Sequence, residues 1–99
     1  MFLAKVVGSV VATQKQARFQ GMKLLLVQPC IARDGVLAES GSSVVAVDSV
    51  GAGLGTYVLF TQGSSARLTP MTKDSPTDAV IVGIVDTIEM AGTKVEMPR

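Results

Sequence analysis

The sequence contains no histidine and no tryptophan, and it has a single cysteine, Cys30. Without histidine, a Ser-His-Asp triad and an imidazole-based metal site are both excluded. One cysteine cannot form an internal disulfide bond, which fits a reducing compartment. Cys30 lies in the apolar run LLLVQPCIA and has no histidine to act as its base. We therefore expect a buried structural thiol rather than a nucleophile.

Charged residues are also scarce. They make up 17% of the chain, against about 25% in an average globular protein. We expect that part of the surface is buried in an oligomer instead of being covered by charge. The net charge of +1 predicts no attraction to nucleic acid or to anionic lipid. Lys15, Arg18 and Lys23 form a loose basic group, which we interpret as a solvated turn and not as a phosphate-binding patch.

Long apolar runs are missing as well. The longest after the N-terminus, AVIVGIV, is far shorter than the roughly 20 residues that cross a bilayer. The N-terminal stretch has no basic region ahead of its apolar run, and Lys5 and Gly8 interrupt that run, so it does not resemble a signal peptide. The sequence predicts a soluble cytoplasmic protein with no membrane partner.

Residues that favour strands are abundant, chiefly valine, isoleucine and threonine. The length of 99 residues fits one domain, residues 1–99. In addition to the five main strands given below, a short sixth strand is expected at TKVEM, after the Ala-Gly turn signal at 91–92. Several short strands at near-regular spacing, with almost no helix, favour a small β-barrel or sandwich. Apolar runs bounded by turn residues predict five main strands at 2–13, 22–31, 43–50, 56–61 and 79–90.

The segments between the strands are short and poor in helical pattern. Residues 64–69 are expected to form one or two helical turns that end at Pro70. Residues 69–78 and 32–43 are expected to be loops, the second with turn signals at Asp34-Gly35 and Ser40-Gly41. A parallel sheet needs a crossover of a dozen or more residues for each pair, so these gaps argue against an α/β fold.

Two of the expected strands are apolar on both faces. In VVAVDSV, Val44, Ala46 and Val50 lie on one face and Val45 and Val47 on the other. Both faces of the last long strand are apolar too. A free-standing antiparallel barrel shows apolar-in, polar-out alternation, so these strands need a second cover. We expect a neighbouring subunit to supply it.

Three glycines crowd the stretch that follows the third expected strand. The spacing of Gly51, Gly53 and Gly55 differs from the G-x-G-x-x-G fingerprint, and a strand-like run follows where that fingerprint needs a helix. No Gly-Lys-Ser/Thr follows either, so we predict no nucleotide cofactor. Asp48, beside the glycines, is expected to accept backbone hydrogen bonds rather than act as a general base. No catalytic residue is identified.

The stretch DSVGAGLGTYVLFTQGSSAR, residues 48–67, closely resembles the signature of bacterial microcompartment vertex proteins, the family of the carboxysome and ethanolamine-utilisation vertex proteins. Three more segments are similar to this family: AKVVGSVVATQK, GMKLLLVQP and DAVIVGIVDTIE. The resemblance spans about residues 4–90. One departure is visible, because Thr56 stands where the family commonly has glutamate.

The resemblance implies an all-β fold: a five-stranded barrel related to the oligonucleotide-binding fold, with one short helix and an extra C-terminal strand. It implies that five copies form a homopentamer at the fivefold vertices of a polyhedral shell, whose faces are tiled by hexagonal shell proteins. Such a protein lies in the shell within the bacterial cytoplasm. It is not an enzyme and needs no cofactor.

The site residues follow from the same resemblance. We expect a loop close to neighbouring subunits and to the central axis, and the alternative is a simple turn facing solvent. Its residues are Asp48, Gly51, Ala52, Gly53, Gly55 and Thr56. A short helix carrying Ser64, Ser65 and Arg67 is expected to present Arg67 to a subunit or shell contact. The alternative there is a serine helix cap and an exposed arginine.

A second function remains open, that of an oligonucleotide-binding module. Such modules combine a basic groove with aromatic stacking platforms. Here the only aromatic residues are Phe2, Phe19, Tyr57 and Phe60, and the net charge is +1. Both requirements are unmet, so we predict no nucleic-acid partner.

Overall fold

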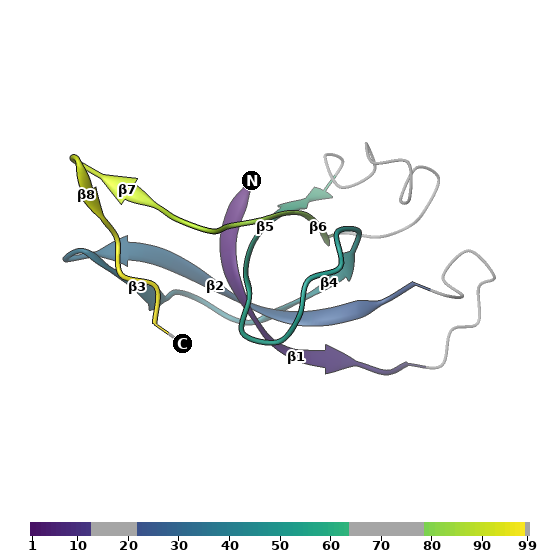
Figure 1. The fold of residues 1–99 in the computed structure, drawn as a ribbon. Coiled ribbons are helices and arrows are strands. Elements are labelled where there is room, and N and C mark those ends of the chain that lie inside the picture. The colour runs from purple at the N-terminus through teal and green to yellow at the C-terminus, as the bar shows by residue number, and fades with distance from the viewer. Residues whose placement is uncertain (13–21, 64–78, 99) are drawn as a thin grey trace.

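A computed structural model describes residues 1–12, 22–63 and 79–98 (Figure 1). These residues form β-strands joined by turns, with no α-helix among them, which confirms the all-β fold. The strands are β1 (Phe2–Val10), β2 (Leu24–Arg33), β3 (Val36–Glu39), β4 (Val44–Asp48), β5 (Tyr57–Gln62), β6 (Ala79–Ile84), β7 (Glu89–Met90) and β8 (Thr93–Lys94). The helix expected at 64–69 lies outside the described residues.

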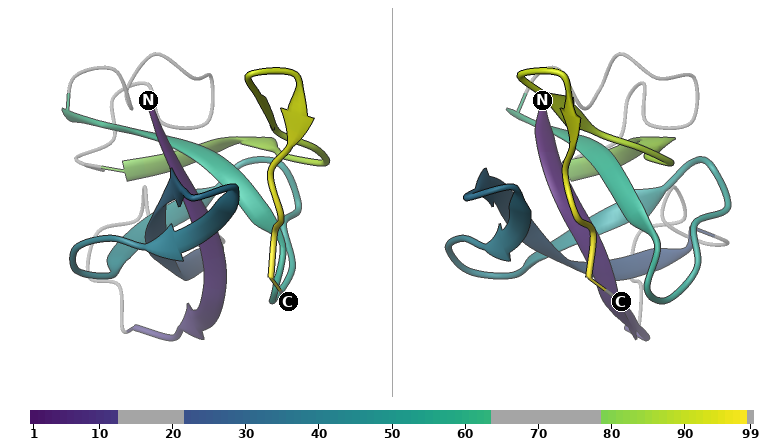
Figure 2. Two further views of the ribbon diagram at one scale, coloured as in Figure 1. Left: turned by 90° about the vertical axis from the view of Figure 1, so that its left-hand side faces the viewer. Right: turned by 60° about the vertical axis from the view of Figure 1, so that its left-hand side comes forward.

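Five of the strands form a closed ring of pairings. The order is β1-β5-β6-β4-β2, and β2 pairs back with β1. The two views in Figure 2 show these strands curving around a shared interior. Every pairing in the ring is antiparallel except β4–β6, which is parallel. These are the five main strands expected from the sequence, although β1 ends at Val10 and not at residue 13.

The expectation of a loop over residues 32–43 is wrong, because part of it forms β3, which pairs with β2. Arg33 pairs with Val36 across a two-residue turn. Asp34 and Gly35 have φ angles of 54° and 79°. Positive φ at both central residues is typical of the tight turns that match the twist of a hairpin. The Asp-Gly turn signal was therefore correct, and the short strand after it was missed.

The last expected long strand, 79–90, is also wrong as one element. The chain leaves the ring after β6 and forms the small β7–β8 hairpin, in which Met90 pairs with Thr93. Ala91 and Gly92 make the turn with φ angles of 54° and 78°, as the Ala-Gly signal indicated. The sixth strand, expected over TKVEM, is limited to β8. Figure 1 shows this hairpin at the same end of the molecule as the β2–β3 hairpin.

The main core fills the interior of the ring. Phe60 and Ile81 are its largest fully buried side chains, and each is on a strand with neighbours on both sides. The other buried members are small or β-branched, apart from one leucine, which lets the strands approach closely. They are Ala4, Val6, Leu25, Val27, Ala46, Ala52, Val58 and Ala79.

A second apolar cluster lies on β4 and β6 outside the main core. Val47 and Val80 are only 2% and 0% exposed. They pack against three partly buried side chains, Met22, Leu24 and Val82. The expectation that a neighbouring subunit covers the second face is therefore wrong for this cluster, since the chain buries it. Val45, from the same face of β4, remains 49% exposed.

The C-terminal segment folds back against the β2–β3 hairpin. Val95 is buried with Leu37 and Tyr57 in a third cluster. Glu96 exchanges two backbone hydrogen bonds with β3 and its turn, of 2.9 and 2.7 Å. Pro98 has no amide proton to extend this ladder, and its carbonyl instead accepts hydrogen bonds from the Tyr57 hydroxyl and the Lys5 ammonium. The tail therefore closes one end of the fold.

Candidate functional site

The glycine-rich segment forms the glycine loop, residues 49–56, which connects β4 to β5. Asp48, the last residue of β4, anchors its start. One carboxylate oxygen of Asp48 accepts hydrogen bonds from the amides of Val50 and Gly51, both at 3.0 Å. Asp48 is 6% exposed, so these bonds form in a site with little water. The predicted role of Asp48 as a backbone acceptor is confirmed.

Lys23 binds the same loop from the start of β2. Its ammonium lies 3.6 Å from the second carboxylate oxygen of Asp48 and donates a 3.0 Å hydrogen bond to the carbonyl of Ala52. Lys23 is exposed, as the interpretation of a solvated turn requires, but its ammonium also binds the glycine loop, which that interpretation did not include; Lys15 and Arg18 lie outside the described residues. Nothing in the sequence indicated that Lys23, which directly precedes a strand, contacts a loop near residue 50.

The three glycines are not equivalent. Gly51 and Gly55 have φ angles of 79° and 84°, in the left-handed region that favours glycine. Gly53 has no such constraint, and a Cβ atom added there would meet only the Thr56 hydroxyl, at 3.9 Å. All three are exposed. Two glycines are therefore required by the turn itself, and the fold of the chain does not require the third.

The end of the glycine loop is fixed to β1. Val6 donates its amide proton to the carbonyl of Thr56, and its own carbonyl accepts from the amide of Gly55, both at 2.9 Å. The amide of Thr56 also bonds to the carbonyl of Gly53 at 3.1 Å. With Asp48 and Lys23 at its start, the loop is held at both ends and forms a defined corner.

Two apolar residues of the loop, two positions apart, differ strongly in exposure. The side chain of Ala52 is 1% exposed and belongs to the main core, so a neighbouring molecule can contact only its backbone. Leu54 is 78% exposed at the tip of the loop. A single exposed leucine is common on protein surfaces, so its meaning depends on the surface around it.

Leu54 separates two hollows in the surface. One has a volume of about 570 Å³ and the other of about 360 Å³. The larger is lined by Leu54, Gly55, Thr56, Tyr57, Ile84, Val85, Asp86 and Met97. The smaller is lined by Val6, Val7, Gly8, Ser9, Lys23, Leu25, Ala52, Gly53 and Leu54. Thr56 and Asp86 both line the larger hollow.

Reactive groups are sparse in the part of the chain that the structure describes. Cys30 is half-buried and not fully buried as expected, and burial, followed by the charge of Glu39, raises the pKa of its thiol. Burial also raises the pKa of the Tyr57 hydroxyl. Residues 1–12, 22–63 and 79–98 contain no group of three acidic, cysteine or histidine side chains placed to hold a metal ion. They also contain no helix long and apolar enough to span a membrane.

The structure thus brings most of the expected site residues into one loop. Asp48 anchors the loop, the glycines shape it and Thr56 ends it. Ser64, Ser65 and Arg67 lie outside the described residues, so their expected roles stay predictions. Lys23 was missing from the expected site, and Leu54 was not among its residues, although Ala52 and Leu54 were the reason to expect an interface there instead of a solvated turn.

Residues 1–86 match the family model described as "Ethanolamine utilisation protein EutN/carboxysome". The chain belongs to this family. The match covers β1 to β6 and the glycine loop, and it ends before the β7–β8 hairpin and the C-terminal tail.

Individual relatives are similar over nearly their whole length. The microcompartment shell vertex protein PduN of Salmonella typhimurium is 50% identical over 90 residues, which cover 89% of this chain and 98% of the relative. The structure of CcmL from Gloeobacter violaceus has a TM-score of 0.85 at 37% identity, over 96% of this chain and 95% of that one. The GrpN pentameric microcompartment shell protein from Rhodospirillum rubrum has a TM-score of 0.78 at 44% identity, over 92% and 99%.

Proposed function

We propose that this protein forms homopentamers that occupy the fivefold vertices of a microcompartment shell in the bacterial cytoplasm. Its partners are then further copies of itself and the hexagonal shell proteins of the faces. The observation that carries the proposal is the likeness, over 92% of the chain, to GrpN, a pentameric microcompartment shell protein. The protein is a structural shell component and not an enzyme. The relatives' names give no support to the nucleic-acid alternative.

The geometry of a shell explains why such a protein needs no catalytic residue. A flat hexagonal layer cannot close into a polyhedron without fivefold positions. A ring of five copies closes through heterologous contacts, in which two different patches of each chain meet. The low charge content of 17% and the exposed apolar side chains, such as Val45 and Leu54, suit a chain that is largely enclosed by such contacts.

Within this assembly, the glycine loop is proposed to contact the neighbouring copy close to the central axis. Three observations support the contact with a neighbouring copy. The loop is held at both ends, it presents Leu54 at 78% exposure, and it has a hollow on each side that a neighbouring chain can fill. Gly53, which the chain's own fold does not require, suits a close approach by a second backbone. Arg67, with Ser64 and Ser65, is proposed to lie at a second subunit or shell contact.

Co-expression with a set of hexagonal shell proteins tests the vertex role directly. Electron microscopy of the purified particles should show closed polyhedra when this chain is present and particles open at their vertices when it is omitted. Antibody or gold labelling of a tagged chain should mark the vertices. Closed shells that form equally well without the chain, or label spread over the faces, would contradict the proposal.

A further inference from the structure

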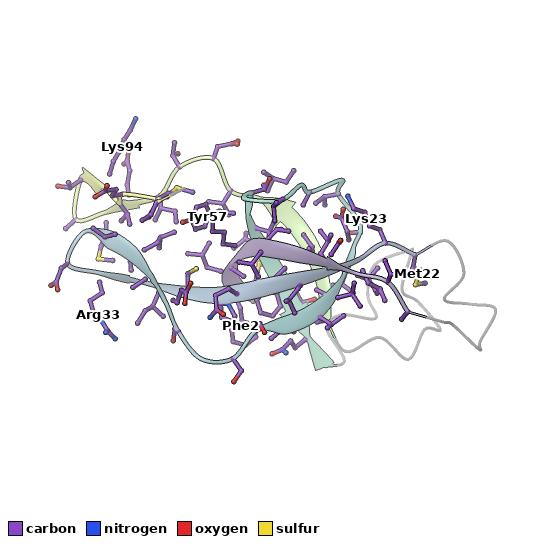
Figure 3. The ribbon with its side chains drawn as sticks, turned by 90° about the horizontal axis from the view of Figure 1, so that it is seen from below. Phe2, Met22, Lys23, Arg33, Tyr57 and Lys94 are labelled. Carbon is purple, nitrogen blue, oxygen red and sulfur yellow. The ribbon has the colours of Figure 1, made fainter. Side chains whose placement is uncertain are left out.

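Lys23 occupies an unusual position relative to the glycine loop. Figure 3 shows Lys23 and Met22 at one end of the molecule, and Arg33 and Lys94 at the other. From this end, the Lys23 ammonium contacts the carbonyl of Ala52 at 3.0 Å and the carboxylate of Asp48 at 3.6 Å. The two contacts lie four residues apart along the chain, so a single side chain joins the start of the loop to its middle.

Backbone contact strengthens this connection. The amide of Asp48 donates a 2.9 Å hydrogen bond to the carbonyl of Lys23, so the two residues are joined through main chain and side chain together. The side chain of Asp48 is 1% exposed and that of Lys23 is 55% exposed. A carboxylate buried to this degree requires hydrogen bonds and a counter-charge. Lys23 supplies the charge, and the amides of Val50 and Gly51 supply the hydrogen bonds.

The contact with Ala52 holds the middle of the glycine loop. Among the described residues, Asp48 holds the amides of Val50 and Gly51, and β1 holds the loop from Gly55 onward. Lys23 holds the carbonyl between these two fixed stretches, directly before Gly53 and Leu54. The direction in which the Leu54 side chain leaves the surface therefore depends on this contact.

We propose that Lys23 is a positioning residue for ring assembly: its ammonium sets the shape of the glycine loop that the neighbouring copy contacts. This inference rests on the proposed function, because it assumes that the loop lies at a subunit contact. Lys23 also lines the smaller hollow, and the positioning role is the part of its effect that is exerted through the loop and not by direct contact with the neighbour. Because the Asp48 side chain is 1% exposed, loss of the Lys23 ammonium also leaves a buried carboxylate without its counter-charge, so Lys23→Met is expected to lower the stability of the single chain as well. The effect specific to the positioning role is expected in assembly and in the mobility of the loop.

The test compares Lys23→Met, which keeps most of the length of the side chain and removes charge and donors, with Lys23→Arg, which keeps the charge and the donors. Native mass spectrometry over a dilution series gives the concentration of half-assembly. Hydrogen exchange of residues 48–56 is followed below that concentration. Lys23→Met should raise the half-assembly concentration about ten-fold, as expected for the loss of a charged hydrogen bond, and should speed exchange in the loop. Lys23→Arg should return both values toward those of the natural chain.

The alternatives give different results. If Lys23→Met weakens assembly without changing loop exchange, Lys23 contacts the neighbour directly and the positioning role is wrong. If Lys23→Met assembles normally whereas Leu54→Ser does not, the inference fails and the loop contact stands. If the natural chain forms no pentamer, the proposed function itself fails. Asp48→Asn removes the same ion pair from its other end. If Lys23→Met does not fold, the half-assembly concentration and the loop exchange of Asp48→Asn are measured in its place.

Discussion

Leu54 illustrates at the scale of one residue how this sequence divides its apolar side chains between fold and assembly. Ala52, two positions earlier, is 1% exposed and completes the core, whereas Leu54 is 78% exposed and contributes nothing to it. In the composition, both residues count simply as hydrophobic. Their difference follows from the loop backbone, which Asp48 and Val6 hold at its two ends.

Replacing Leu54 with serine should therefore weaken the ring and leave the single chain intact. Burial of a leucine contributes about 1.5–3 kcal/mol, and the loss should appear in each subunit contact. Native mass spectrometry measures the shift toward smaller species. Met90→Ser is the matched control, because Met90 is 51% exposed on the β7–β8 hairpin and lines neither of the hollows beside Leu54. Equal effects of the two substitutions would refute the special role of the loop.

The glycines of the loop should respond differently to a methyl group. Gly51→Ala places alanine at a φ of 79° and should cost the single chain about 1–2 kcal/mol of unfolding free energy. Gly53→Ala has room for its Cβ and no positive φ, so it should change that free energy by less than about 0.5 kcal/mol. Urea unfolding of the dissociated chain measures both. A larger loss for Gly53→Ala than for Gly51→Ala is the opposite of this expectation.

Cys30 should make stability fall in alkaline solution. Burial, and then the charge of Glu39, raise the pKa of its thiol in the folded chain, so the folded state holds this proton more tightly than the unfolded state does. The stabilisation is complete at neutral pH. It declines as the pH rises through the unfolded-state pKa of about 8.5 toward the folded-state value. Unfolding midpoints at pH 7 and pH 9.5 should differ more for the natural chain than for Cys30→Ser. An identical decline in Cys30→Ser would exclude this cause.

Contacts between residues close in the sequence could be predicted, whereas contacts that depend on how the strands pair could not. The role of Asp48 was predictable because an aspartate before a glycine turn accepts local amides. The contact of Lys23 was not, since it joins residues 25 positions apart whose proximity depends on the pairing of β2 with β4. That Thr56 departs from the family's usual residue stays a prediction, whereas its place with Asp86 in the lining of the larger hollow depends on the path of the chain after β6.

At the scale of elements, turns were more predictable than the strands around them. Asp34-Gly35 and Ala91-Gly92 both form the tight turns that their sequences indicated. The strands next to them were missed or misjudged because two to four residues carry too little periodicity to be recognised. Such short strands are stabilised by pairing with other segments. β3 pairs with β2 on one edge and with the C-terminal tail on the other.

The tail should contribute to stability through one buried side chain. Val95 is 6% exposed and packs with Leu37 and Tyr57. Val95→Ala removes two methyl groups from this cluster and should lower the unfolding free energy by about 1.5–2 kcal/mol. Lys94→Ala, an exposed neighbour, should change it by less than about 0.5 kcal/mol. Chemical denaturation compares the two, and equal small effects would show that the tail does not pack as described.

At the scale of the whole molecule, the fold and the assembly use different parts of the same strands. The ring of five strands encloses a core of small and β-branched residues, and Val47 and Val80 extend that core to the outer face of β4 and β6. Exposed apolar side chains remain at the glycine loop, on β4 and at the end of β6, where Ile84 is 46% exposed. Low charge predicted an oligomer from composition, whereas the location of the uncovered surface required the fold.

Native mass spectrometry of the unmodified chain over a concentration series tests the central claim most directly. A ring closed by heterologous contacts should give a dominant species of five subunits, with little population of dimers to tetramers, since the last contact closes the ring. That result is what the account predicts. A chain that remains monomeric at all concentrations, or that forms even-numbered species in place of the pentamer, would contradict it.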